Sequence, residues 1–242
     1  MELETDPDPG WVAALAGCPS SVADARLREA ASETRLFRHL RAEHRQEGRP
    51  SYVEIDAPLE LYALTRLLNP RHVVEVGVSS GVSSAYLLQA LERNGRGTLH
   101  SVDRPKLAPP APTGRQRATA SWSLPPGRSS GWAVPQSLRA RWDLRIGDKK
   151  VVLPLLAAEL PRVDLFVYDV PHDDVGSRTE FAALDRRLPS RGVAIADHGP
   201  GGGRCAALTW WAHRREATPV GRRGLGLYGF RANRPRSHGT LR

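Results

Sequence analysis

The sequence is short of cysteine and of long apolar runs, and each shortage excludes a class of protein. Its 242 residues include two cysteines, Cys18 and Cys205, and neither has a second pair of metal ligands nearby. The sequence therefore indicates neither a disulfide framework nor a zinc knuckle. No run approaches the roughly 18 to 20 apolar residues that a membrane span needs. Because the first ten residues are acidic and Pro-rich rather than basic and then apolar, we expect a cytoplasmic protein without a membrane partner.

Lysine is scarce as well, since Lys106, Lys149 and Lys150 are the only three in the chain. Arginine therefore carries most of the formal net charge of +9. A basic stripe would indicate a nucleic-acid-binding face, but these arginines are scattered through every segment. Nucleic acid is thus not the favoured partner, although the basic tail at 233–242 keeps that alternative open.

Two helical segments are predicted before residue 70. Within residues 21–45, one helical face collects the apolar side chains of Val22, Leu27, Ala30, Phe37 and Leu40, which predicts a single amphipathic helix. A second helix is expected to begin after Asp56 as N-cap, with Pro58 in its first turn, and to stop at the Asn-Pro pair 69–70. We expect residues 1–55 to form a helical extension that covers the main domain.

From residue 72 onward, short apolar runs alternate with helical segments. The runs are 72–77, 98–103, 142–148, 163–169 and 192–197, and the helical segments are 83–94, 149–160, 176–188 and 204–215. This alternation predicts an α/β domain over 56–232, with a doubly wound, Rossmann-like, mostly parallel sheet and helices on both faces. Ligands bind beyond the carboxyl ends of such strands, and four of the five runs end at or beside an acid, namely Asp103, Asp148, Asp169 and Asp197.

The first run leads into a glycine loop and then a helix. Gly77 lets the chain turn off the strand, Gly81 allows a ligand close to the backbone, and Ser83 and Ser84 are predicted to cap the helix. The free N–H groups of the helix start favour an anionic group such as a carboxylate. Ser79 stands where a nucleotide-binding fingerprint has its middle glycine, which weakens a pyrophosphate site. No G-K-[ST] follows, so a P-loop is excluded.

At these residues a resemblance appears. "VVEVGVSSGVS" resembles the first motif of class I S-adenosylmethionine-dependent methyltransferases, in the form found in the catechol and caffeoyl-coenzyme A type O-methyltransferases. "TLHSVD", "LRIGDKKVVLPLL" and the stretch from "VDLFVYD" to "IADH" are similar, in the same order, to the family's second strand, its adenine segment and its fourth to fifth strands. The resemblance covers about residues 55 to 230, including "GLGLYGF" as a closing strand.

The resemblance implies a role for each matching position. Gly77, Gly81 and Ser83 would line the methionine part of S-adenosylmethionine, with Glu75 buried behind them. Asp103 would accept the two ribose hydroxyls, a task that suits a carboxylate. Asp148 would lie near the adenine amino group.

For the chemistry, the resemblance implies a divalent cation held by Asp169, Asp197 and His198, which would lower the pKa of the acceptor hydroxyl. His198 departs from the family, whose last pair is more often two acids or an acid and an amide, and it would suit a softer ion than magnesium. The alternative is a reaction without metal, in which His172 or His198 is the general base.

Residues 104–141 form an insertion rich in Pro, Gly, Ser and Arg, and we expect irregular structure there. It is either a disordered linker or a lid whose Trp122 and Trp132 close on the acceptor. The favoured function is methyl transfer to a small molecule, at oxygen. A nucleic-acid methyltransferase and a non-catalytic relative remain alternatives, and a homodimer is left open.

Overall fold

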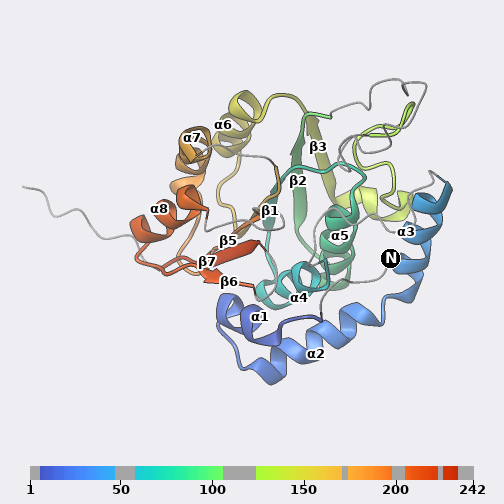
Figure 1. Cartoon of the computed structure of the whole chain (residues 1–242), viewed down its shortest axis with the longest axis horizontal. Coiled ribbons are helices and arrows are strands. Elements are labelled where there is room, and N and C mark those ends of the chain that lie inside the picture. The colour runs from blue at the N-terminus through green and yellow to red at the C-terminus, as the bar shows by residue number, and fades with distance from the viewer. Residues whose placement is uncertain are drawn as a thin grey trace, which may run out of the picture.

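Five apolar runs form the parallel strands of one sheet in the computed structural model, which describes residues 6–46, 58–105, 124–170, 174–197, 205–222 and 226–233. The strands are β1 (His72–Val76), β2 (Thr98–Asp103), β3 (Trp142–Ile146), β4 (Leu165–Tyr168) and β5 (Val193–Asp197). Two antiparallel strands, β6 (Val220–Gly221) and β7 (Leu227–Arg231), complete the order β3-β2-β1-β4-β5-β7-β6 (Figure 1). The predicted mostly parallel, Rossmann-like sheet is confirmed.

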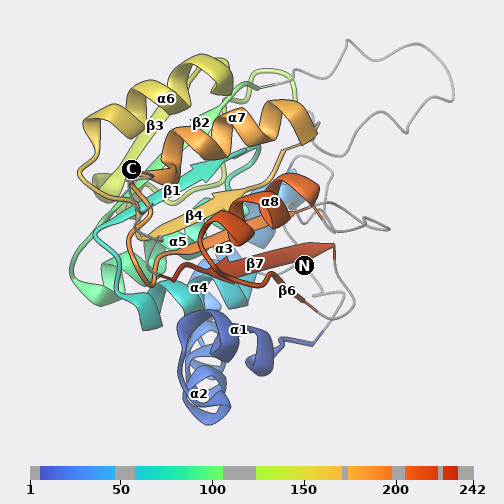
Figure 2. The ribbon, with the colours of Figure 1, turned by 90° about the vertical axis from the view of Figure 1, so that its left-hand side faces the viewer.

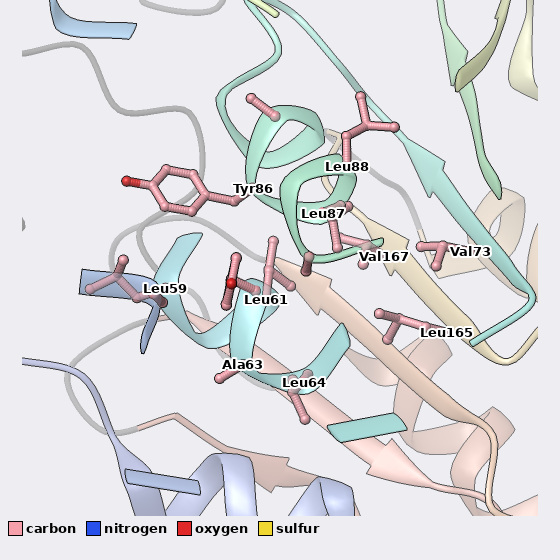
Figure 3. Close-up of a cluster of buried hydrophobic side chains, with 14 of the residues drawn as sticks. Leu59, Leu61, Ala63, Leu64, Val73, Tyr86, Leu87, Leu88, Leu165 and Val167 are labelled. Carbon is pink, nitrogen blue, oxygen red and sulfur yellow. The ribbon is translucent and has the colours of Figure 1, made fainter. Parts of the chain in front are cut away.

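Helices cover both faces of the sheet because alternate strand residues point to opposite sides. On one face, Val73 and Val167 pack under α4 (Pro58–Leu68) and α5 (Val82–Asn94). Figure 3 shows Leu61 of α4 and Leu87 of α5 directed toward these strands. The predicted helix after Asp56 is confirmed as α4, whereas Asp56 itself lies outside the described residues.

The opposite face is covered by α6 (Lys149–Glu159), α7 (Asp174–Asp185) and α8 (Ala206–Arg214), as Figure 2 shows. Its core is rich in aromatic rings, with Phe181 stacked on Trp211 at 5.4 Å between ring centroids. Cys205 is buried at the start of α8 and Cys18 is half-buried, and both are free thiols.

The single helix predicted over 21–45 is wrong, because the structure has α2 (Ser20–Ala31) and α3 (Thr34–Gln46). At the break, the Ser32 hydroxyl donates to the backbone oxygen of Glu29 at 2.7 Å, a local bond that competes with helix continuation. Val22 is 43% exposed, although the pattern placed it on the apolar face. The two helices pack on different partners, α2 against α4 and α3 against α5.

A further helix, α1 (Pro9–Ala16), was not predicted. Asp8 caps it by accepting from the backbone N–H of Trp11 at 3.0 Å, and Gly17 ends it with φ +65°. The indole N–H of Trp11 donates to the backbone oxygen of Val220 at 2.9 Å, so α1 is docked on β6. This contact makes the N-terminal helices part of the main core.

The described part of the insertion, residues 124–141, has one regular element, the 3₁₀ helix η1 (Gln136–Arg141). The rest is irregular, as predicted, but it is packed rather than open, since Leu124, Val134 and Leu138 are buried. Residues 106–123, with Trp122, lie outside the described residues. Within the described ranges, no helix is both long enough and apolar enough to cross a membrane.

Candidate active site

The candidate site starts at the turn that follows β1. Gly77 has φ +95°, and a Cβ atom there would lie 1.9 Å from the backbone oxygen of Asp169. Glycine is therefore needed both for the positive φ and for the close approach of the end of β4. Because β1 lies between β2 and β4, this turn stands where the strand order reverses, which is where open α/β sheets bind ligands.

Glu75 lies behind this turn and is fully buried, as the resemblance implied. Its carboxylate accepts hydrogen bonds from the hydroxyls of Ser83 at 2.7 Å, Ser84 at 2.6 Å and Ser101 at 2.7 Å. Ser101 accepts in turn from the indole N–H of Trp142 at 2.8 Å. The carboxylate thus joins α5 to β1 and β2.

The predicted capping of α5 by Ser83 and Ser84 is wrong. The N-cap residue is Gly81, with φ +91°, and no side chain caps the helix. A serine caps from the N-cap position itself, whereas these serines are the second and third residues of α5. Their hydroxyls donate to Glu75 instead, because a buried carboxylate requires donors.

Residues 129–134 of the insertion lie directly against the first loop, which is the segment 77–81 between β1 and α5. The backbone N–H of Gly131 donates to the backbone oxygen of Ser79 at 2.7 Å. A Cβ atom on Gly81 would lie 2.9 Å from the Cα atom of Gly131. The absence of a side chain at Gly81 thus allows a close approach of the protein's own chain, and contact of Gly81 with a ligand remains a prediction.

Asp103 ends β2 beside the same loop and is 9% exposed. One carboxylate oxygen accepts from the backbone N–H of Val78 at 3.4 Å, and the other accepts from the hydroxyl of Ser130. A carboxylate has about four acceptor sites, so Asp103 keeps capacity for ribose hydroxyls.

Asp148 is the N-cap residue of α6, where it accepts from the backbone N–H of Lys150 at 2.9 Å. It also pairs with Arg104 at 2.9 Å, and its side chain is 42% exposed. The described contacts of Asp148 thus shape the start of α6, and contact with adenine remains a prediction.

Asp169 and Asp197 follow neighbouring strands in register. β4 pairs with β5 so that Tyr168 lies opposite Ala196, and each acid is the next residue along its strand. The prediction that both emerge at one edge is therefore confirmed. His172 and His198 lie outside the described residues. Within the described residues, no group of three or more His, Cys, Asp and Glu side chains could hold a metal ion.

The sequence did not single out the buried cluster beside Asp169. Tyr168 and Lys149 both donate to the carboxylate of Glu180 on α7, and Lys149 does so at 2.6 and 2.8 Å. Burial raises the pKa of Tyr168, and its hydrogen bond to Glu180 raises it further, so the phenol stays protonated. The cluster fixes the end of β4 from the α6–α7 side.

The sequence also missed His44, which lies on the apolar face of α3, four residues after Leu40 and eight after Leu36. Its ring is buried, with Nδ1 2.7 Å from the backbone oxygen of Leu40 and Nε2 2.9 Å from the hydroxyl of Ser80. Such regular spacing is typical of a residue in the hydrophobic core. Only the fold shows that this core residue contacts the loop between β1 and α5.

The strand order reverses at β1, where the chain makes a glycine turn, and acids stand at the ends of β2, β4 and β5. This arrangement is that of a doubly wound α/β protein with a ligand site at the strand ends. The family model described as "Methyltransferase domain" matches residues 74–198, slightly more than half of the chain. The chain belongs to this methyltransferase domain family, which confirms the predicted class. No curated protein has a significantly similar sequence.

Solved methyltransferase structures share the fold. An S-adenosylhomocysteine-bound methyltransferase from Podospora anserina is 12% identical, with a TM-score of 0.55 and coverage of 82% of this chain and 88% of that chain. The O-methyltransferase TomG from Streptomyces achromogenes, involved in tomaymycin synthesis and solved with S-adenosylmethionine, is 19% identical, with a TM-score of 0.52 and the same coverage. A methyltransferase from Geobacter sulfurreducens is 17% identical, again with the same coverage and with a TM-score of 0.53.

Proposed function

We propose that this protein transfers a methyl group from S-adenosylmethionine to an oxygen atom of a small molecule. The observation that carries the proposal is the meeting of the Gly77 turn, Asp103 and Asp169 around the point where the strand order reverses. Family membership supports methyl transfer. The similar fold of TomG, an O-methyltransferase that takes part in tomaymycin synthesis, supports oxygen and a small acceptor.

The described residues fit the cofactor. Asp103 would hold the ribose hydroxyls through its remaining acceptor sites. The Ser83 hydroxyl gives its proton to Glu75, so toward the methionine part it would serve as an acceptor, which suits an ammonium group. Gly77 and Gly81 would line this part through their backbone, and Asp148 would lie near adenine.

When bound, the cofactor supplies a methyl group on a positively charged sulfur. The chain's own task is to align the acceptor and to keep its oxygen deprotonated or polarised. Asp169 and Asp197 stand at neighbouring strand ends for this task, and with His198 they would hold a divalent cation. The alternative without metal gives the general-base role to His172 or His198.

The use of arginine supports a small acceptor rather than nucleic acid. Many described arginines pair with acids within the chain, for example Arg104 with Asp148 and Arg141 with Glu92, both at 2.9 Å or less. An arginine neutralised in this way adds less to an attractive field for phosphates. Salt-dependent retention on immobilised nucleic acid would favour the rival function instead.

Titration calorimetry with S-adenosylhomocysteine, with and without added divalent cation, tests the proposal. We expect binding in both conditions, because the β1–β2 residues proposed to hold the cofactor do not require the metal. Failure to bind in either condition would favour a non-catalytic relative of the family.

A further inference from the structure

We infer that Trp132 and Arg128 of the insertion bind the carboxylate of the cofactor's methionine part, an inference that rests on the proposed function. The indole N–H of Trp132 is buried and has no hydrogen-bond acceptor among the residues that the structure describes. A buried donor without an acceptor is destabilising, so a folded protein that retains one needs a reason for it.

Other tryptophans in the described part of the chain show what an indole donor ordinarily has. The indole N–H of Trp11 donates to the backbone oxygen of Val220 at 2.9 Å. That of Trp142 donates to the hydroxyl of Ser101 at 2.8 Å, and that of Trp211 donates to the carboxylate of Asp185 at 2.7 Å. The acceptor that Trp132 lacks would come from a bound ligand.

Trp132 is held firmly beside the first loop. On one side of it the backbone N–H of Gly131 donates to Ser79, and on the other side that of Ala133 donates to the backbone oxygen of Ser80 at 3.0 Å. Gly131 has φ +70°, and a Cβ atom there would lie 2.0 Å from the ring of Trp142, so the path of this segment is closely fixed. The indole therefore has a defined position next to the loop proposed to hold the methionine part.

The nearest ring cannot supply the missing acceptor. His44 lies 5.0 Å from Trp132 between ring centroids. Its Nδ1 must carry the proton that it shares with the backbone oxygen of Leu40, since a carbonyl oxygen only accepts. Nε2 lies 2.9 Å from the Ser80 hydroxyl, so both ring nitrogens already have hydrogen-bond partners.

A positive charge beside the donor selects a negatively charged oxygen. The guanidinium carbon of Arg128 lies 4.9 Å from the ring centroid of Trp132. An N–H donor and a cation together favour a carboxylate, whose two oxygens can engage both groups. The cofactor has one carboxylate, and it belongs to the methionine part.

Calorimetry with two ligands tests the inference in Trp132→Phe, which keeps an aromatic ring and removes the N–H. S-adenosylhomocysteine has the carboxylate, whereas 5′-methylthioadenosine has the same nucleoside and sulfur without the amino-acid part. We expect Trp132→Phe to bind S-adenosylhomocysteine roughly 10-fold more weakly, because a charge-assisted hydrogen bond is lost, and to bind 5′-methylthioadenosine as the native protein does.

Trp210→Phe is the matched control, because Trp210 on α8 also lies under an arginine, with the guanidinium carbon of Arg214 5.2 Å from its ring centroid. Trp210 is far from the first loop along the chain and packs on the other face of the sheet. Trp210→Phe should change neither affinity. Equal weakening of both ligands in Trp132→Phe, or no weakening, would overturn the inference while leaving the proposed function intact. Failure of the native protein to bind S-adenosylhomocysteine would instead overturn the proposed function, and the inference with it.

Discussion

The β1–β2 half of the strand edge and the β4–β5 half hold their acids in different ways. In the β1–β2 half, Glu75 is enclosed by three serine hydroxyls, and Asp103 meets Val78 and Ser130. In the β4–β5 half, the parallel register brings Asp169 and Asp197 to adjacent strand ends. Under the proposed function, acids of the first kind would contribute to stability and cofactor binding, whereas acids of the second kind would act in the reaction.

The largest effect should come from the β4–β5 half. Asp197→Ala, or excess chelator with the native protein, should lower methyl transfer about 100-fold or more, because polarisation of the acceptor oxygen is lost. The measurement is S-adenosylhomocysteine formation with an acceptor identified from a panel of small hydroxylated molecules. Affinity for S-adenosylhomocysteine should stay within about twofold, as it should in the control Asp24→Ala on α2. Full activity in chelator would end the metal hypothesis and leave His172 or His198 as the base.

Glu75→Ala should lower the free energy of unfolding by about 3 kcal/mol, because three buried hydroxyls lose their acceptor and a cavity opens. Glu75→Gln keeps the shape and one carbonyl oxygen, so its loss should be smaller. Urea unfolding followed by tryptophan fluorescence measures both. If Glu75→Ala were as stable as the native protein but failed to bind cofactor, Glu75 would be a binding group, and the comparison between the two halves would be wrong.

Asp103→Ala should weaken S-adenosylhomocysteine binding by about 1 to 3 kcal/mol, the cost of losing a charged hydrogen-bond partner. Unlike Trp132→Phe, it should weaken 5′-methylthioadenosine by a similar amount, since both ligands contain the ribose. Calorimetry with the two ligands separates these cases. Unchanged affinity would remove Asp103 from the site.

The smallest effect should come from Ser130→Ala. Asp103 has acceptor sites beyond those that Ser130 and Val78 use, so affinity for S-adenosylhomocysteine should change by less than about threefold. The free energy of unfolding should fall by about 1.5 kcal/mol, since one hydrogen bond to a charged group is lost. A large gain in affinity would show that Ser130 competes with the ribose.

The five parallel strands could be predicted from sequence because each lies in a short run rich in apolar residues. The two-residue strand β6 (Val220–Gly221) was not predicted, since it depends on pairing with β7. The break at Ser32 could not be predicted either, because α2 and α3 separate in order to pack on different partners. The short α1 depends on docking against Val220 rather than on a long periodic pattern.

Within the site, local reasoning found the Gly77 turn and the shared edge of Asp169 and Asp197. It failed where the partner lies on another element, as with Ser83 and Ser84 of α5, which donate to Glu75 of β1, and with the segment around Trp132, which bonds to Ser79 and Ser80. The approach of Gly131 to Gly81 joins segments 50 positions apart, and no local pattern reports such a contact.

The bond from Trp11 to Val220 has a consequence for how the chain folds during synthesis. The two residues are 209 positions apart, so α1 leaves the ribosome long before its docking strand exists. At about 5 to 20 residues per second, this delay is roughly 10 to 40 seconds. During that time the apolar face of α1, with Trp11, Val12 and Leu15, lacks its final cover. α1 can thus pack against α2 and α4 early, but it completes its packing only when β6 and β7 have been made.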